Sequence, residues 1–294
     1  MSLRSLHEVP APAKVNLFLH VVGRRDDGYH LLHSLFVPID WIDTLHFERR
    51  DDGRLQRHDL GATLPADDLC LKAARALQAA SGTRHGVDLS IDKRIPSGAG
   101  LGGGSSDAAS TLLALNRLWG LNWPKSRLLP LAASLGADVP FFIGGTPALV
   151  EGIGERLTPA EVPRMWLAVV KPAASIPTAD IFRDPTLKRD TDPDILMGSF
   201  DDDAQRITAW VSGFGRNDLQ PPAQRQCPEV AQAARWLEDR FGNSRMTGSG
   251  SAVFARAGTG DQPVATFEVQ DLAPGWEGRM CRSLARHPLC GWAD

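Results

Sequence analysis

Residues 95–110, IPSGAGLGGGSSDAAS, place five glycines within the seven positions 98–104. Glycine is used this densely where the backbone must adopt positive φ angles or approach another group closely. The run follows an alternating stretch at 87–93, which predicts a strand, and precedes an apolar stripe that predicts a helix over 105–119. A flexible linker rarely joins two elements so clearly patterned. The stretch therefore predicts a loop whose backbone N–H groups, together with the helix N-terminus, bind phosphate.

Two common phosphate-binding motifs do not describe this loop. Residues 98–103, GAGLGG, satisfy G-x-G-x-x-G, but a dinucleotide site also needs an acidic residue about 20 positions on, and 108–137 contains no Asp or Glu. A Walker A loop needs a lysine before its Ser/Thr, and here Gly104 precedes Ser105. We therefore expect another phosphate cradle, in which Ser105 and Ser106 cap the helix and one hydroxyl reaches a magnesium ion.

Composition narrows the class of protein and of ligand. The 294 residues are 43% hydrophobic and 23% charged, and the formal net charge is −3. The chain therefore has no excess of positive charge that would attract nucleic acid or an anionic membrane. The chain contains no signal-peptide pattern and no uninterrupted apolar run of membrane-spanning length. Its four scattered cysteines form no C-x-x-C pair and predict free thiols. We expect a cytoplasmic protein that binds small molecules, and the pattern leaves its oligomeric state open.

Periodicity also outlines the domain organisation. The strand predicted over 13–22 places Lys14 and Asn16 on one face, because side chains alternate along a strand. The apolar pattern restarts at about residue 164, so we predict two domains, 1–160 and 161–294. The remaining elements are extended segments at 31–47 and 164–172, a hairpin within 144–163, and helices at about 69–81, 125–135 and 228–240.

The glycine loop resembles the signature P-x-x-x-G-L-G-S/G-S-S-x-A-A of the GHMP small-molecule kinase superfamily, since 96–109 reads PSGAGLGGGSSDAA. Within that superfamily, segments 10–32, 135–142 and 175–182 resemble the kinases that act on 4-diphosphocytidyl-2-C-methyl-D-erythritol. The resemblance runs in order from residue 10 to about 255. It implies an α+β fold of two domains, the nucleotide-binding domain first, with the active site in the interdomain cleft. It also implies transfer of the γ-phosphoryl of ATP, with Mg²⁺, to the substrate's 2-hydroxyl in the non-mevalonate isoprenoid pathway.

The resemblance assigns catalytic and nucleotide-binding residues. Asp138, which alone would read as a turn-former, corresponds to the carboxylate that accepts or orients the hydroxyl proton. Lys14, otherwise an exposed strand lysine, corresponds to the cation beside that carboxylate. The ATP-binding loop comprises Pro96, Ser97, Gly98, Ala99, Gly100, Leu101, Gly102, Gly103, Gly104, Ser105 and Ser106.

The same resemblance assigns the substrate site. Tyr29 and Phe182 are expected to stack on the two faces of the cytosine ring. His30 is expected to hydrogen-bond the base edge through its side chain or backbone. Asn16 and Thr178 are expected to complete the substrate contacts.

A second glycine turn, MTGSGSAVFA at 246–255, resembles the superfamily's third motif, and its Gly248 and Gly250 are expected to pack against the phosphate loop. One position departs from the pattern. Where relatives have Asp-Asn-Leu, this chain has Asp68 in place of the asparagine. A carboxylate cannot donate a hydrogen bond as an amide does, so the resemblance does not imply an adenine contact at Asp68. Lys93 is expected on the adenine side.

Two other functions compete with this interpretation. The first is another kinase of the superfamily, acting on homoserine or mevalonate, and the DDGYH and IPTADIF segments argue against it because they suit a cytosine clamp. The second is a catalytically inactive nucleotide-binding regulator, which the presence of both Lys14 and Asp138 disfavours. The sequence leaves the magnesium ligands open, and whether Asp138 abstracts the proton or only orients the hydroxyl.

Overall fold

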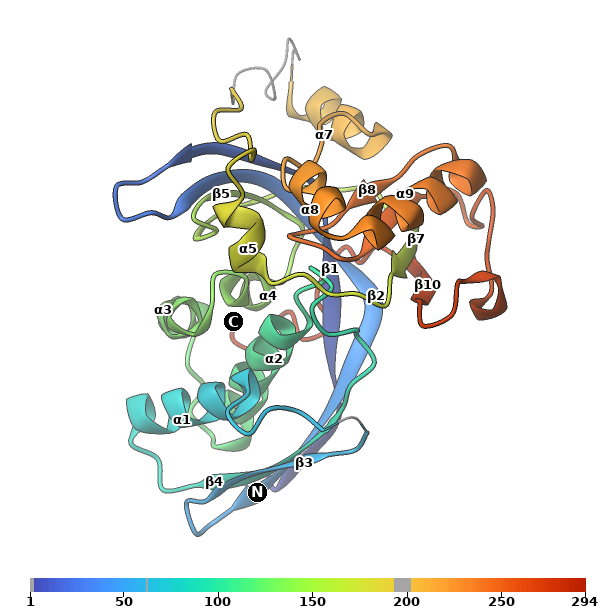
Figure 1. Ribbon diagram of the computed structural model, residues 1–294. Coiled ribbons are helices and arrows are strands. Elements are labelled where there is room, and N and C mark those ends of the chain that lie inside the picture. The colour runs from blue at the N-terminus through green and yellow to red at the C-terminus, as the bar shows by residue number, and fades with distance from the viewer. Residues whose placement is uncertain (1–2, 62, 193–201) are drawn as a thin grey trace.

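Two β-sheets and the helices packed on them make up the computed structural model, which describes residues 3–61, 63–192 and 202–294 (Figure 1). The strands are β1 (Ser5–Arg24), β2 (His30–Arg50), β3 (Leu55–Asp59), β4 (Gly86–Asp92), β5 (Ala148–Gly152), β6 (Arg156–Pro159), β7 (Trp166–Lys171), β8 (Arg245–Met246), β9 (Val253–Arg256) and β10 (Glu277–Arg282). The helices are α1 (Leu69–Ser81), α2 (Gly103–Leu118), α3 (Lys125–Leu135), α4 (Val139–Gly144), α5 (Thr178–Arg183), α7 (Asp203–Ser212), α8 (Gln220–Gln226), α9 (Pro228–Phe241) and the 3₁₀ turn η1 (Val269–Asp271).

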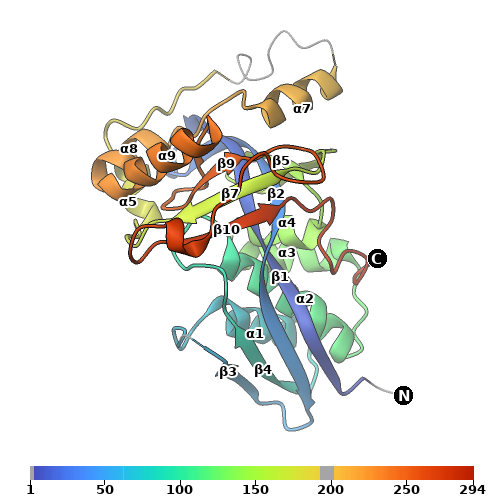
Figure 2. The ribbon, with the colours of Figure 1, turned by 90° about the vertical axis from the view of Figure 1, so that its right-hand side faces the viewer.

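The first sheet has the order β3-β4-β2-β5-β6, and β1 pairs with β2 beside this path. All of its pairings are antiparallel except that of β3 with β4. The long strands β1 and β2 extend toward the second sheet (Figure 2). The predicted strands at 13–22 and 31–47 lie within them, and the predicted hairpin is β5–β6, so these predictions are confirmed.

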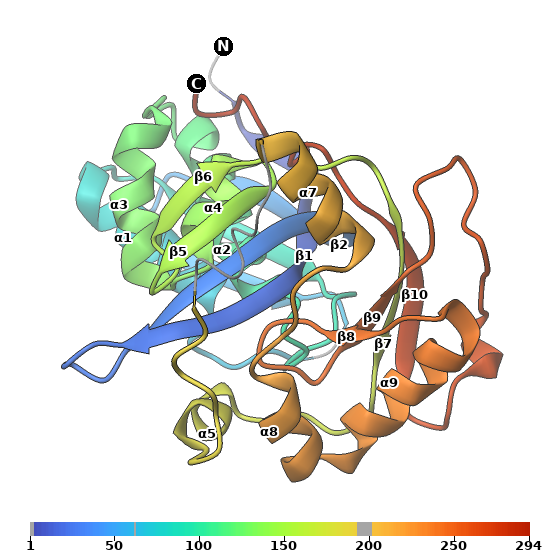
Figure 3. The ribbon, with the colours of Figure 1, turned by 90° about the horizontal axis from the view of Figure 1, so that it is seen from above.

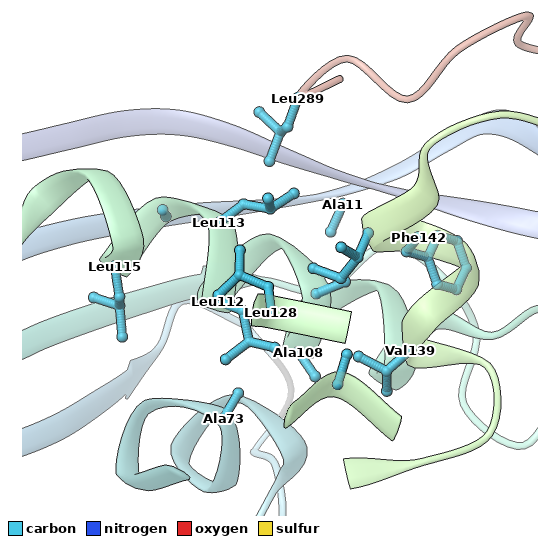
Figure 4. Packing of buried hydrophobic residues seen from close by; sticks show 14 of the residues in the cluster. Ala11, Ala73, Ala108, Leu112, Leu113, Leu115, Leu128, Val139, Phe142 and Leu289 are labelled. Atoms are coloured by element: carbon cyan, nitrogen blue, oxygen red, sulfur yellow. The ribbon is translucent and has the colours of Figure 1, made fainter. Parts of the chain in front are cut away.

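Helices α1 to α4 cover one face of the first sheet, with α2 enclosed between the sheet and the other helices. Nearly all side chains of α2 are buried, as expected of a helix surrounded by other elements. Leu112 projects toward the neighbouring helices and Leu113 toward the strands (Figure 4). Burying one such leucine contributes about 1.5–3 kcal/mol, so this layer holds the phosphate loop on a rigid base.

The second sheet has the order β10-β7-β9-β8, with α9 packed on one face and α8 beside α9 (Figure 3). Val15 and Leu17 of β1 share a core with Leu167 and Phe254 of this sheet. The strands of the first sheet end at Pro159 and those of the second begin at Trp166. The division into domains 1–160 and 161–294 stays a prediction, because β1 contributes to the cores of both sheets.

The C-terminal segment 283–294 returns from β10 to the first helical layer. The His287 N–H donates to the Gly145 carbonyl at the end of α4, at 2.7 Å, and the Lys125 N–H donates to the Ala293 carbonyl at 2.8 Å. Leu289 is buried in the same core as α2 (Figure 4). The last residues, which carry no recognisable motif, therefore brace the helix that follows Asp138. Among the described helices, none combines the length and apolarity needed to cross a bilayer.

Candidate active site

The glycine-rich loop between β4 and α2 depends on backbone conformations that only glycine adopts freely. Gly98, Gly100 and Gly102 have φ angles of 63°, 72° and 70°. The helix α2 begins at Gly103, two residues earlier than predicted, and its N-cap is Gly102, which has no side chain. The predicted capping by Ser105 and Ser106 is therefore wrong.

The loop encloses a cavity of about 370 Å³ at the N-terminus of α2. Ten of the eleven residues assigned to ATP binding, Pro96 to Ser105, line it. Ser106 lies fully buried beneath, and its hydroxyl has no partner among the described residues. Free N–H groups and the helix dipole favour an anion in such a cavity.

Lys93 also lines this cavity, but its ammonium group is committed to two buried carboxylates. It donates to Asp107, at 2.6 Å, and to Asp43. Asp43 in turn accepts the backbone N–H groups of Arg94 and Ile95, at 2.5 and 2.7 Å. Burial raises the pKa of the Asp107 carboxyl, while the Lys93 ammonium acts in the opposite direction. Lys93 therefore anchors the start of the phosphate loop with two of its three ammonium donors, and the adenine contact expected of it remains a prediction.

Asp68 also has a structural role. Its carboxylate caps α1 by accepting the Leu71 N–H at 3.0 Å, and it pairs with Arg57 at 2.9 Å. The helix predicted over 69–81 is confirmed.

Lys14 lies between the phosphate loop and Asp138. Its backbone N–H donates to the Leu101 carbonyl at 2.9 Å, and a Cβ added to Gly102 would lie 3.2 Å from Lys14 Cε. Its Nζ is 3.5 Å from Asp138 Oδ2 and donates to Asn16 Oδ1 at 2.7 Å. Burial lowers the pKa of Lys14, and the Asp138 carboxylate partly opposes that effect.

Asn16 stands behind Lys14 and is fully buried. Its side-chain oxygen accepts from Lys14, Thr247 and Gly248, and its Nδ2 donates to Ser34 at 2.9 Å. The predicted alternation is thus confirmed, since Lys14 and Asn16 share a face. The amide oxygen and one of the two amide N–H donors are used within the protein, and the substrate contact predicted for Asn16 remains a prediction.

The second glycine turn packs directly against the phosphate loop. A Cβ on Gly248 would lie 2.8 Å from the Gly100 carbonyl oxygen, and one on Gly100 would lie 2.3 Å from the Thr247 oxygen. The Ala252 N–H donates to the Ala99 carbonyl at 3.1 Å. The predicted packing of the two turns is confirmed, and it requires glycine on both sides.

A second cavity, of about 830 Å³, brings together predicted residues from distant parts of the chain: Asp138, Tyr29, His30, Thr178 and Phe182. Tyr29 is 60% exposed, and the rings of His30 and Phe182 are stacked with centroids 4.9 Å apart. Three arginines that no sequence motif indicates also line this cavity: Arg24, Arg183 and Arg189.

Comparisons with known proteins agree with this geometry. The N-terminal domain of GHMP kinases matches residues 68–146, and the C-terminal domain matches residues 201–268. A 4-diphosphocytidyl-2-C-methyl-D-erythritol kinase from Methylibium petroleiphilum is 62% identical over 294 residues, which cover the whole of both chains. This chain belongs to the 4-diphosphocytidyl-2-C-methyl-D-erythritol kinase family.

Solved structures place this kinase family member in the expected fold. A crystal structure of 4-(cytidine 5′-diphospho)-2C-methyl-D-erythritol kinase is 36% identical, with a TM-score of 0.69 over 86% of this chain and 90% of that one. Homoserine kinase from Cytophaga hutchinsonii has a TM-score of 0.70 at 18% identity, over 97% of this chain and 96% of that one. The latter likeness concerns the fold alone. The expected α+β GHMP kinase fold is confirmed, and the chain is a small-molecule kinase of that family.

Proposed function

We propose that this enzyme transfers the γ-phosphoryl of ATP to the 2-hydroxyl of 4-diphosphocytidyl-2-C-methyl-D-erythritol, giving the 2-phosphate and ADP, in the non-mevalonate isoprenoid pathway. One structural observation supports the proposal in addition to the similarity to full-length relatives. Lys14 contacts the phosphate loop through its backbone and Asp138 through its ammonium group, and Asp138 lines the large cavity. A phosphoryl donor in one cavity and an acceptor hydroxyl in the other would therefore meet at this pair.

The pair suits phosphoryl transfer to an alcohol. Asp138 accepts a hydrogen bond from the hydroxyl and takes its proton as the new oxygen–phosphorus bond forms and the bond to the β-phosphate oxygen breaks. The Lys14 ammonium stabilises the Asp138 carboxylate and the negative charge that develops on the acceptor oxygen. Buried contacts with Asn16 and the Phe36 ring hold that ammonium in place.

Magnesium fits the first turn of α2. The buried Ser106 hydroxyl has no partner among the described residues, and the same is true of Asp107 Oδ1. Mg²⁺ prefers oxygen ligands and in kinases takes most of them from phosphates and water, so no complete protein cage is needed. Ser106 and Asp107 would hold the ion, which when bound supplies charge neutralisation for the transferred phosphoryl group.

The large cavity suits a cytidine diphosphate group. We propose that Tyr29 and Phe182 stack on the base, a contact worth about 1–3 kcal/mol per base. His30 would hydrogen-bond the base edge, and Thr178, which is linked to Ser249 at 2.7 Å, would lie toward the sugar. The four cysteines are unpaired, which supports a cytoplasmic location.

Release of ADP from Mg-ATP tests this function. The purified protein is offered the diphosphocytidyl substrate, its analogue lacking the cytidylyl group, or homoserine. We expect turnover with the first alone. Turnover with homoserine, or ATP binding without turnover of any acceptor, would contradict the proposal and support one of the two competing functions.

A further inference from the structure

Arg189 occupies the wall of the large cavity, and all its guanidinium nitrogens donate hydrogen bonds. Two of these nitrogens bind backbone carbonyls in and after α5. Nη2 donates to the carbonyls of Phe182 and Asp184, at 2.9 and 2.8 Å, and Nη1 donates to the Leu187 carbonyl at 3.1 Å. The third, Nε, donates to His30 Nε2 at 3.0 Å. Arg189 thus links the end of α5, which carries Phe182, to the ring proposed to read the base.

This bond determines the protonation of the His30 ring. An arginine nitrogen can only donate, so His30 Nε2 must be the unprotonated acceptor. The single proton of the neutral ring therefore lies on Nδ1. Burial, and then the positive charges of Arg189 and Arg24, lower the pKa of His30, so the ring is neutral at pH 7. Among the described residues Nδ1 has no hydrogen-bond partner, and it is left as a donor for a ligand.

We propose that Arg189 is a specificity-determining residue that acts through His30. Arg189 holds the His30 ring in the form that carries its proton on Nδ1, and this form selects a pyrimidine with a hydrogen-bond acceptor at N3. Cytosine has a lone pair at N3, whereas uracil has an N–H there. A fixed donor therefore pairs with cytosine and meets a second donor in uracil. This inference rests on the proposed cytidine site and adds how that site tells the two bases apart.

Loss of the arginine changes the hydrogen-bonding character of the ring. In Arg189→Met, His30 Nε2 becomes free to carry the proton, and Nδ1 then becomes an acceptor that suits the N3–H of uracil. Affinity for cytidine falls while affinity for uridine rises. Since a hydrogen bond of ordinary strength corresponds to about tenfold in affinity, we expect the cytidine-to-uridine preference to fall by about tenfold or more.

The first test uses the unaltered protein. Long-range ¹H–¹⁵N NMR of histidine-labelled enzyme at pH 8 distinguishes protonated from unprotonated ring nitrogens, and His30→Asn assigns the signal. We expect a proton on Nδ1 of His30 in the wild type and a mixture of tautomers in Arg189→Met. A wild-type ring protonated on Nε2 would overturn the inference, whatever the enzyme binds.

The second test measures the dissociation constants of CDP and UDP at pH 8, with the phosphate loop saturated by a non-hydrolysable ATP analogue. Arg225→Met is the matched control, because Arg225 also fastens the 184–186 turn, through Asp184 and Thr186, but does not touch His30. We expect a reduced CDP-to-UDP preference in Arg189→Met and an unchanged one in Arg225→Met.

The outcomes distinguish a failure of the proposed cytidine site from a failure of the role proposed for Arg189. If the wild type binds UDP as well as CDP, the proposed cytidine site fails. If the wild type prefers CDP and Arg189→Met keeps the full preference, the cytidine site stands and the role of Arg189 is refuted. An equal loss in both arginine variants would show that anchoring of the turn, rather than the tautomer, sets the preference, and would also refute it.

Discussion

Replacing Gly100 by alanine tests the contact between the two glycine turns. Gly100 has a φ of 72°, and a Cβ there would lie 2.3 Å from the Thr247 carbonyl oxygen. Real Cβ contacts essentially never fall below 3.0 Å, so the turns must separate by at least 0.7 Å, the difference between these two distances. The obstacle is backbone on both sides, and a change of rotamer cannot relieve it.

Two terms contribute to the expected loss of stability. An alanine in the left-handed region costs about 1–2 kcal/mol. Forcing an extra methyl group into a packed contact costs about 1–3 kcal/mol more. Gly120→Ala isolates the first term, because Gly120 has a φ of 69° and no atom lies within 4 Å of its added Cβ. We therefore expect Gly100→Ala to be destabilised by about 2–5 kcal/mol and Gly120→Ala by about 1–2 kcal/mol.

Urea denaturation measures these free energies of unfolding, and steady-state kinetics measures the functional effect. A displacement approaching 1 Å at a positioned group can reduce the rate by about 10²-fold, so kcat/KM for ATP should fall to that extent in Gly100→Ala and stay near wild type in Gly120→Ala. If the two variants proved equal in both stability and kcat/KM, the contact between the turns would have no role in forming the nucleotide site.

The remaining predictions concern charge. Asp138→Asn should lower kcat by about 10²–10⁴-fold while ATP still binds. Equilibrium binding of an ATP analogue measures whether the variant keeps its affinity for the nucleotide. Lys14→Met should lower single-turnover rates by about 10²-fold or more. Since burial lowers the pKa of Lys14 from 10.5, the wild-type rate should decline with rising pH before that value, and the variant should lack this decline. Burial lowers the pKa of His287 to about 4. The unfolded chain binds this proton below about pH 6.5 and the folded chain only below about pH 4, so the unfolding free energy should fall by about 3 kcal/mol between pH 7 and pH 4. Chemical denaturation of His287→Gln should show a smaller fall in the unfolding free energy between pH 7 and pH 4 than the wild type shows. The same pH dependence in both proteins would contradict this role of His287.

The fold was predictable where local chemistry marks the ends of an element. Asp68 and Gly82 bound α1, and the predicted helix over 69–81 matches the structure. The start of α2 was misplaced because serine is usually the better cap, whereas here Gly102 enters the helix from a left-handed conformation. A Cβ at Gly102 would also lie 3.1 Å from Lys14 Cγ and 3.2 Å from Phe142 Cζ, and the local sequence does not reveal these two neighbours.

That the loop residues gather around one cavity was predictable, because they belong to one compact motif. Contacts between distant residues could not be predicted. Arg189 and His30 are 159 positions apart, and the Lys93 ammonium joins Asp43 from the first sheet to Asp107 from α2. Neither arrangement has a characteristic spacing, because each depends on how the sheets and helices pack.

The return of the C-terminal segment to the first helical layer has a consequence for biosynthesis. Leu289 and Ala293 are buried in the core that supports the phosphate loop, and Gly145, at the end of the helix that follows Asp138, is bonded to His287. Translation reaches these residues only after both sheets have been made, so the N-terminal half of the chain cannot complete its own core while it is being made. A chain that lacks residues 283–294 would thus keep Lys14 and Asp138, the proposed catalytic residues, and lose part of the core that supports them.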